Sequence, residues 1–481
     1  MASRRDQLHS YQFMIQRVVA ALVMRETDPA QSPFRRAAGA IFAGIMVAAI
    51  TVAGFMVYGL WKPGGNTEWM KAGGEQGKPI VVVEEETGAV YVFRGGVLYP
   101  AANFTSAMLA AGAEGGNVRP QTVSRNSLAD SPIRRGDLIG IPGAPDALPS
   151  PQNLISGDWS LCSQPKINKK GAKDGLETVM VVGQRPSPLQ LFGGESVLLV
   201  EDEESSDKYI VYKSYKFKIV GEDLVRPALN LTRTPLKVGA AWLTALPEGE
   251  EIKPLDIPGD GGSSTALDGA TVGDVYQTEG LADRTYYVAL QDKFASVTEL
   301  QAALLMASRH QADPMRVSAS DLKQPSTELL PKEGEGAPPE SARLNELRPN
   351  PDQATCAIFG SDDKPPTMAI NGQLPIGPYD GTETQLRGES GERLTSRVVV
   401  ANGRGAFVHV SRSGKPTGML VLVTDTGKYY PLASDEVIKL LGYDPKKTPY
   451  GLMPENLVAR LPRGPTLDPA DAVQPVLSDQ N

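Results

Sequence analysis

The feature that most constrains this chain is an uncharged apolar run near its start. From Ala37 to Trp61, 25 consecutive residues carry no charge. A helix of that length spans about 37 Å, and the hydrocarbon core of a bilayer is about 30 Å thick. A cleaved signal peptide would have a shorter apolar core followed by small residues, whereas Lys62 and Pro63 follow Trp61. We therefore expect an uncleaved transmembrane helix at residues 37–61.

The charges on either side of this helix indicate its orientation. Residues 1–36 contain six Arg and three acidic residues, a net charge of +3, although the whole chain carries −8. The remainder therefore carries −11. Because short basic flanks remain on the cytoplasmic side, we expect a cytoplasmic arm at 1–36 and a large acidic domain outside.

An acidic exterior without clustered Lys and Arg also argues against nucleic acid as a partner.

The cytoplasmic arm has the pattern of an amphipathic helix. Several apolar side chains share one face, and arginines lie beside them: Phe13, Met14, Val18, Ala21 and Leu22, with Arg17 and Arg25. Such a helix either lies in the membrane interface or packs on a partner protein, and the sequence leaves both open.

The chain has two cysteines, Cys162 and Cys356, and both lie on the predicted outer side. Thiols are oxidised in such compartments, so we expect a disulfide between them. Two unpaired buried thiols are the alternative. Within the membrane helix, Ala40, Gly44 and Ala48 recur at every fourth residue, which gives a face of small residues on which another helix can pack.

Internal repeats predict the fold of the outer part. Residues 88–143 and 422–465 share an apolar strand, a Thr-Gly turn, a Tyr-Pro pair, a short helix and an Arg-Gly pair. The Tyr-Pro pairs begin at Tyr99 and Tyr430, and the Arg-Gly pairs end at Gly136 and Gly464. Similar patterns begin at Asp207 and Arg284. Each copy changes from strand to helix periodicity, so we expect an α+β protein with about four small repeat domains in an elongated array.

Segments of another character separate the repeats, and pairing of the two cysteines would bring the distant ones into a single central β-rich domain. The expected units are a linker and ectodomain start at 62–87, repeat 1 at 88–150, the central disulfide-linked domain at 155–194 and 350–415, repeat 2 at 195–262, repeat 3 at 277–323, a solvated connector at 324–349, repeat 4 at 418–465 and a C-terminal tail at 466–481.

Catalytic motifs are mostly absent. The Gly-Lys pairs at Gly77 and Gly427 do not continue as phosphate-binding loops, because Pro79 and Tyr429 stand where Ser or Thr is needed. The chain has three histidines, and His9 lies across the predicted membrane from the other two, which argues against a serine triad or a multi-histidine metal site. We therefore expect no cofactor and no metal. Acidic clusters such as 84–86 and 201–204 are typical of solvated loops.

The order of several short motifs resembles the EccB family, the single-pass membrane component of type VII (ESX) secretion systems. The motifs are SYQFMIQRVVAALVMRETD, PFRRAAGAIFAGIMVAAITVAGF, YP…SAMLAAG, IGIPGAP, DWSLC, VGAAWLTALPEG, GRGAFV, TGKYYPL and LPRGP. The resemblance covers nearly the whole chain. It implies an inner (cytoplasmic) membrane protein with a periplasmic C-terminal domain, a central domain bordered by repeats, and a disulfide between Cys162 and Cys356.

The resemblance also implies partners: EccC-, EccD- and EccE-like components, the mycosin protease, and further copies of the chain. Family members have been described as ATPases, which the motifs of this sequence do not support. We expect a structural core subunit of an actinobacterial type VII secretion complex that anchors and builds its extracytoplasmic part. Two alternatives remain: an extracytoplasmic nucleotide hydrolase, and a membrane anchor that binds the cell wall.

Overall fold

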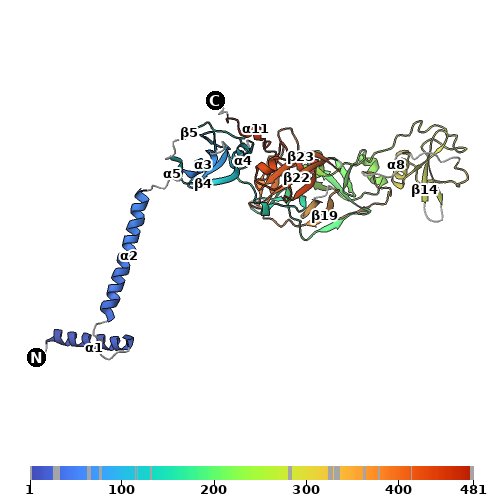
Figure 1. The fold of residues 1–481 in the computed structure, drawn as a ribbon. Coiled ribbons are helices and arrows are strands. Elements are labelled where there is room, and N and C mark those ends of the chain that lie inside the picture. Colours follow the sequence, from blue (N-terminus) through green and yellow to red (C-terminus); the bar gives the residue numbers. More distant parts are fainter. Residues whose placement is uncertain are drawn as a thin grey trace.

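A computed structural model describes residues 3–24, 33–61, 67–74, 78–113, 115, 117–129, 133–168, 170–279, 284–322, 329, 336–360, 364–377, 380–412 and 414–476. Two helices, α1 (Arg4–Met24) and α2 (Pro33–Trp61), precede an ectodomain of five β-sheets and short helices. The ectodomain is drawn out along one direction, and α1 runs crosswise to α2 (Figure 1). The predicted fold class is confirmed: an α+β protein with one N-terminal apolar helix and several sheet domains.

Repeat 1 is the sheet next to the membrane helix, with strand order β4-β1-β2-β3-β5. Its elements are α3 (Glu68–Gly74), β1 (Ile80–Glu84), β2 (Val90–Arg94), β3 (Val97–Pro100), α4 (Phe104–Ala113), β4 (Asn117–Val123), α5 (Arg125–Ala129) and β5 (Arg134–Arg135). The first three strands form an antiparallel meander. The chain then crosses over through α4, so that β4 lies parallel to β1 and β5 parallel to β3.

Three more sheets have the same order of meander, helix and parallel strand. Repeat 2 contains β9 (Ser196–Asp202), β10 (Lys208–Tyr212), β11 (Tyr215–Lys218), α6 (Glu222–Ala228), β12 (Leu236–Val238) and α7 (Ala240–Ala245). Repeat 3 contains β13 (Val275–Glu279), β14 (Arg284–Ala289), β15 (Phe294–Val297), α8 (Glu299–Arg309) and β16 (Met315–Arg316). Repeat 4 contains β22 (Gly405–Arg412), β23 (Lys415–Thr424), β24 (Tyr429–Pro431), α9 (Val437–Leu440), β25 (Tyr450–Pro454), α10 (Glu455–Val458) and α11 (Pro469–Ala472). In each of them the strand after the helix pairs in parallel with the first strand of the meander.

The central sheet has seven strands in the order β20-β21-β7-β6-β18-β19-β8. They come from two distant parts of the chain: β6 (Trp159–Ile167), β7 (Lys173–Val182) and β8 (Gln190–Phe192), then β18 (Ala354–Phe359), β19 (Thr367–Gly372), β20 (Thr382–Glu383) and β21 (Arg397–Val399). A short 3₁₀ helix, η1 (Pro151–Asn153), precedes β6. Strands β6 and β18 are antiparallel neighbours, so repeats 2 and 3 are an insertion between the halves of this sheet.

The four repeats pack in pairs. Helix α4 of repeat 1 packs against α9 and α11 of repeat 4, and the two repeats share one apolar core. The contact is so close that a Cβ on Gly112 would lie 2.8 Å from Cδ2 of Leu440. At the other end, Leu300 and Leu304 of α8 are buried in the core of repeat 2. The central sheet lies between the pairs, with one face packed against α7 and against repeat 4 (Figure 1).

The sheets extend beyond some of the predicted boundaries. Strand β1, at 80–84, lies in the segment that we expected to be a linker and the start of the ectodomain, and it is the first strand of repeat 1, which therefore begins before residue 88. Strand β22, at 405–412, was expected in the central domain but pairs with β23 and β25 of repeat 4. Ile257, expected at the end of repeat 2, packs in the core of repeat 3. Alternating apolar residues identify a strand, but they do not tell which sheet it joins.

The connector also differs from expectation, and the tail packs on the repeats. Within the connector, β17 (Asn345–Glu346) pairs with β9, and Ala342 and Leu344 pack on the core of repeat 2. Residues 323–328 and 330–335 lie outside the described residues. In the tail, Leu467 is fully buried, and Val476 donates its backbone N–H to Leu138 of repeat 1. The tail therefore links the end of repeat 4 to repeat 1.

Candidate functional site

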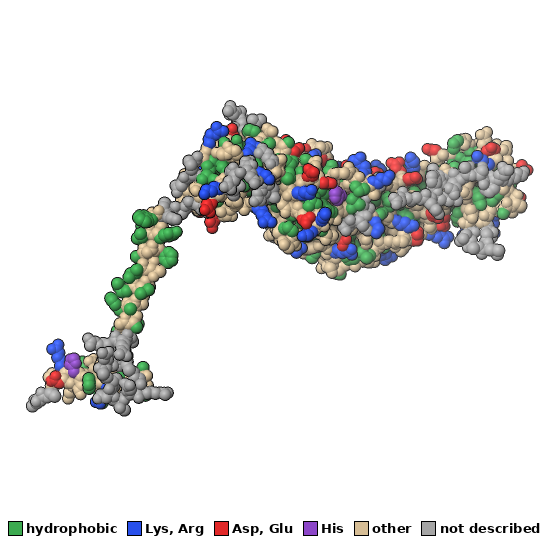
Figure 2. Space-filling view, in the orientation of Figure 1, with side chains coloured by type: hydrophobic (Ala, Val, Ile, Leu, Met, Phe, Trp, Pro, Cys, Tyr) green, Lys and Arg blue, Asp and Glu red, His purple; other side chains and the backbone are tan. Residues whose placement is uncertain are grey.

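Helix α2 is the one described helix long and apolar enough to cross a membrane, over Ala38–Trp61. On the face seen in Figure 2, α2 carries hydrophobic side chains, in contrast to the mixed charges of the ectodomain. The residues predicted for helix packing, Ala40, Gly44 and Ala48, are all exposed, and a Cβ on Gly44 would meet no atom within 4 Å. This face of small residues is thus free to receive a second helix.

Trp69 fixes the ectodomain close to the membrane helix. It lies on α3, is 4% exposed, and packs edge-on against Phe93 with ring centroids 5.4 Å apart. Because seven peptide units join Trp61 to Glu68, the end of the membrane helix and the start of α3 lie within about 25 Å of each other. Repeat 1 is consequently held near the surface of the membrane.

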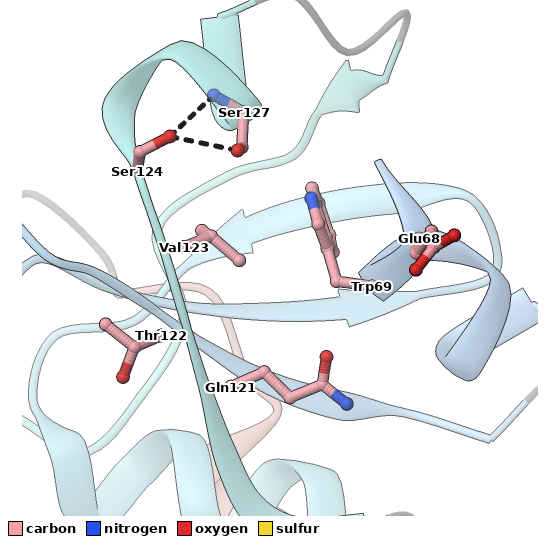
Figure 3. Close-up of a pocket in the computed structure, with 7 residues that line it drawn as sticks. All are labelled: Glu68, Trp69, Gln121, Thr122, Val123, Ser124 and Ser127. Atoms are coloured by element: carbon pink, nitrogen blue, oxygen red, sulfur yellow. Dashed lines mark hydrogen bonds between the residues drawn. The ribbon is translucent and has the colours of Figure 1, made fainter. Parts of the chain in front are cut away.

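Beside Trp69 lies a pocket of about 530 Å³, lined by Glu68, Gln121 to Ser124 and Ser127 (Figure 3). Ser124 Oγ accepts the backbone N–H of Ser127 at 3.3 Å and lies 3.0 Å from the Ser127 hydroxyl. This is the geometry of a cap at the start of α5. The indole N–H of Trp69 is buried without a partner among the described residues. The two serines cap α5, and the ring of Trp69 packs on Phe93. We therefore assign the pocket to the packing of α3.

The acidic cluster at 84–86 begins at the buried end of β1 and continues into an exposed turn, so the expectation of a solvated loop holds for Glu85 and Glu86 but not for Glu84. Glu84 is buried at the end of β1 and accepts a hydrogen bond from Nε of Arg125 at 2.8 Å. This bond lowers the pKa of Glu84 and raises that of Arg125. Glu86 accepts the backbone N–H of Arg125 at 2.8 Å. Both carboxylates therefore hold the start of α5 against the sheet.

The central sheet carries two cross-links. Cys162 on β6 and Cys356 on β18 are directly opposite each other and joined by a disulfide, with their Cα atoms 4.0 Å apart. On β7 and β21, Glu177 and Arg397 form a buried ion pair at 2.9 Å. Arg397 also donates to the backbone carbonyls of Gly377 and Asp380. Together they join the two halves of the sheet, which are far apart in sequence.

The model of one protein family, described as "Type VII secretion system ESX-1, transport TM domain B", matches residues 1–476. The chain belongs to this family, EccB. The resemblance predicted from the motifs is therefore confirmed, and helix α2 agrees with the TM domain in the family's description.

Curated relatives of this EccB chain include two from Mycobacterium tuberculosis (strain H37Rv). The ESX-3 secretion system ATPase EccB3 is 25% identical over 98% of this chain and 89% of the relative. The ESX-2 secretion system ATPase EccB2 is 28% identical over 92% of this chain and 89% of the relative. Solved structures share the fold. A chain of an intact ESX-5 inner membrane complex matches with a TM-score of 0.61 and 24% identity, covering 99% of this chain and 96% of that one. The EccB3 dimer from the ESX-3 core complex gives 0.60 and 22%, covering 82% and 100%.

The names of both relatives contain the word ATPase, so the Gly-Lys pairs at Gly77 and Gly427 of this EccB chain are of interest. Gly427 and Lys428 form the turn between β23 and β24, and Gly427 has a positive φ of 75°. A phosphate-binding loop instead connects a strand to the N-terminus of a helix. Gly77 lies outside the described residues.

The sequence interpretation missed three important residues of EccB. Trp69 lay in a predicted linker, where a lone aromatic residue gives no periodic signal. The ion pair of Glu177 and Arg397 joins residues that are far apart in the chain, and no local pattern relates them. The predicted cysteines were easier to find because only two are present.

Proposed function

We propose that this EccB protein is a structural core subunit of an actinobacterial type VII secretion complex. Its arm lies in the cytoplasm, α2 crosses the inner membrane, and the ectodomain builds the periplasmic part. The short connection from Trp61 to the buried Trp69 carries this proposal, because it fixes an elongated, rigidly packed ectodomain at the membrane surface. A freely tethered enzyme domain would not require such an anchor.

Three surfaces offer places for partners. The arm α1 exposes apolar side chains such as Leu8, Phe13 and Leu22 on the cytoplasmic side. The exposed small-residue face of α2 suits packing with other membrane helices. The paired repeats offer a long outer surface. We assign these surfaces to EccC-, EccD- and EccE-like components, to further copies of the chain, and on the outside to the mycosin protease.

The first test is capture of the complex from native membranes. The chain carries a C-terminal tag, membranes are solubilised in a mild detergent, and the captured material is analysed by native electrophoresis and mass spectrometry. A megadalton species with EccC-, EccD- and EccE-like chains is expected. A lone chain or simple oligomer in several mild detergents would contradict the scaffold function.

A matched pair of variants tests the small-residue face. Gly44 and Gly39 both lie on α2, and a Cβ on either would meet no atom within 4 Å. At about 100° per residue they point roughly 140° apart. Gly44→Leu is expected to reduce recovery of the large complex, and Gly39→Leu to leave it unchanged. Equal recovery with both variants would rule out this face as a packing surface.

Nucleotide hydrolysis is a second candidate, favoured only by the names of the curated relatives. Turnover of ATP by the purified full-length protein would support it if one point mutation abolished turnover while the melting temperature stayed the same. Sedimentation of the protein with purified wall material would likewise support a cell-wall anchor. We expect neither result.

A further inference from the structure

A second pocket lies where repeat 2 meets the central sheet, and it has a volume of about 730 Å³. Segments 232–237 and 346–351 form its two walls. Leu199 of β9 and Leu176 of β7 also line it. All these residues belong to the described part of the chain. The pocket is within the size range of small-molecule and side-chain binding sites, about 300–1,000 Å³.

Strand β9 lies open at the pocket. On this side β17 pairs with Ser196 and Val197, and β12 pairs with Val200 to Asp202. Between these two pairings, Leu198 directs its backbone groups to β10, and Leu199 directs its backbone groups to this side. The walls contain three prolines, which have no backbone N–H to donate: Pro235, Pro349 and Pro351. An apolar site beside an open stretch of strand suits an extended peptide.

Glu346 places an incompletely paired carboxylate in this apolar site. Its side chain is 9% exposed, and its Oε2 lies 3.7 Å from Nε of Arg233. The other oxygen, Oε1, is buried and has no hydrogen-bond partner among the described residues. A buried carboxylate oxygen without a partner destabilises the fold unless a ligand supplies the missing donor. Glu346 is therefore the group that a bound cation would satisfy.

Two exposed basic side chains of the pocket, Lys237 and Arg348, carry the charge opposite to that of Glu346. The side chain of Lys237 is 69% exposed and lies 3.7 Å from Glu201. Arg348 is exposed and forms no ion pair with any residue that the structure describes. A complementary ligand carries a positive group for Glu346, an apolar middle part for the leucines, and a negative group for Arg348.

We propose that this pocket binds a lysine or arginine side chain from an extended segment of a partner polypeptide. The ammonium or guanidinium group donates to Glu346, and its methylene stem packs on Leu176 and Leu199. An acidic residue two positions after the basic one lies on the same side of the extended segment and faces Arg348. The site goes beyond the scaffold function, since its test measures a contact of this pocket alone and not assembly of the complex.

The test measures binding of a labelled peptide to the full-length protein in detergent micelles by fluorescence anisotropy. The probe is Leu-Lys-Leu-Asp-amide with fluorescein on its N-terminal amine, and the control peptide has norleucine in place of lysine, which removes only the ammonium group. A hydrogen bond between charged groups contributes about 1.5–3 kcal/mol, so the lysine peptide is expected to bind at least about tenfold more tightly. Equal binding of the two peptides, or no binding of either at millimolar concentration, would overturn the proposal.

Two variants tie the binding to Glu346. Glu346→Gln keeps the shape of the side chain and is expected to abolish the preference for lysine, with a melting temperature equal to or above that of the wild type. Glu195→Gln, at a 69% exposed glutamate outside the pocket, is expected to keep the preference. Retained preference in Glu346→Gln would refute the site. If a cell-wall peptide of alanine, D-glutamate and diaminopimelate bound more tightly than the lysine peptide, the proposal of a polypeptide ligand would be overturned.

Discussion

Gly136 lies directly against the ring of Tyr99. A Cβ at Gly136 would be 2.4 Å from Cδ1 of the tyrosine, a distance that no side chain tolerates without movement. The backbone N–H of Gly136 also donates to the carbonyl of Leu98 at 3.0 Å. The ring thus fills the space of the missing side chain while the backbone pairs beside it.

The same relationship recurs in two other repeats. In repeat 4, a Cβ placed on Gly464 would lie 2.3 Å from the ring of Tyr430. In repeat 2, a Cβ placed on Gly249 would lie 2.2 Å from the ring of Phe217. Each glycine N–H donates to the carbonyl just before the aromatic residue. The Tyr-Pro and Arg-Gly pairs that revealed the repeats are therefore two halves of one contact, which closes the second parallel pairing of each sheet.

This contact predicts the effect of adding a methyl group. Gly464→Ala forces the Tyr430 ring to move and is expected to destabilise repeat 4 by about 1–3 kcal/mol, as overpacking usually does. Thermal unfolding of the full-length protein measures it as a lower melting temperature. The control is Gly193→Ala, since a Cβ at Gly193 would meet no atom within 4 Å. Similar melting temperatures for the two variants would show that the ring tolerates the methyl group.

The sequence predicted what is local or repeated, and failed where distant segments meet. The membrane helix, the α+β class and the existence of repeats follow from periodicity. The pairing of repeat 1 with repeat 4 does not, because the surfaces of α4 and α9 are merely apolar and carry no information about their partner. Likewise Ala342 and Leu344 lie in a segment rich in Pro, Glu and Gly, yet repeat 2 buries them. Tertiary contacts decided both cases.

The disulfide leads to a second prediction. Cys162 and Cys356 are fully buried and separated by 194 residues, so the bond closes a long loop of the unfolded chain. The double variant Cys162→Ala with Cys356→Ala is expected to lose about 2–5 kcal/mol of stability. A reducing agent should lower the melting temperature of the wild type and leave that of the double variant unchanged. An equal effect on both proteins would trace the loss to another cause.

Glu222 predicts a dependence of stability on pH. Lys208, at 2.5 Å, and Arg226, at 2.8 Å, hydrogen-bond its carboxylate and lower its pKa below the ordinary value of 4.5. A carboxyl group with a lowered folded-state pKa stabilises the fold above its unfolded pKa, and this contribution disappears as the pH falls through the folded value. Glu222→Gln should therefore lower the melting temperature by a few degrees at pH 7, and the difference should shrink below about pH 4. A difference independent of pH would show that the loss does not depend on the charge.

The buried ion pair of the central sheet predicts that losing one partner strongly destabilises the protein, and that replacing the other partner as well restores part of the stability. Arg397 is 4% exposed, and its loss would leave Glu177 charged and buried, with Gln164 as its remaining partner at 2.8 Å. Arg397→Met is expected to destabilise the protein by about 3–5 kcal/mol, the usual result of removing one member of a buried pair. Adding Glu177→Gln removes the unpaired charge and should restore part of that stability. The carbonyls of Gly377 and Asp380 would still lack their donor, so rescue should remain incomplete. A double variant no more stable than Arg397→Met would show that these carbonyl bonds, rather than the ion pair, hold β21 in the sheet.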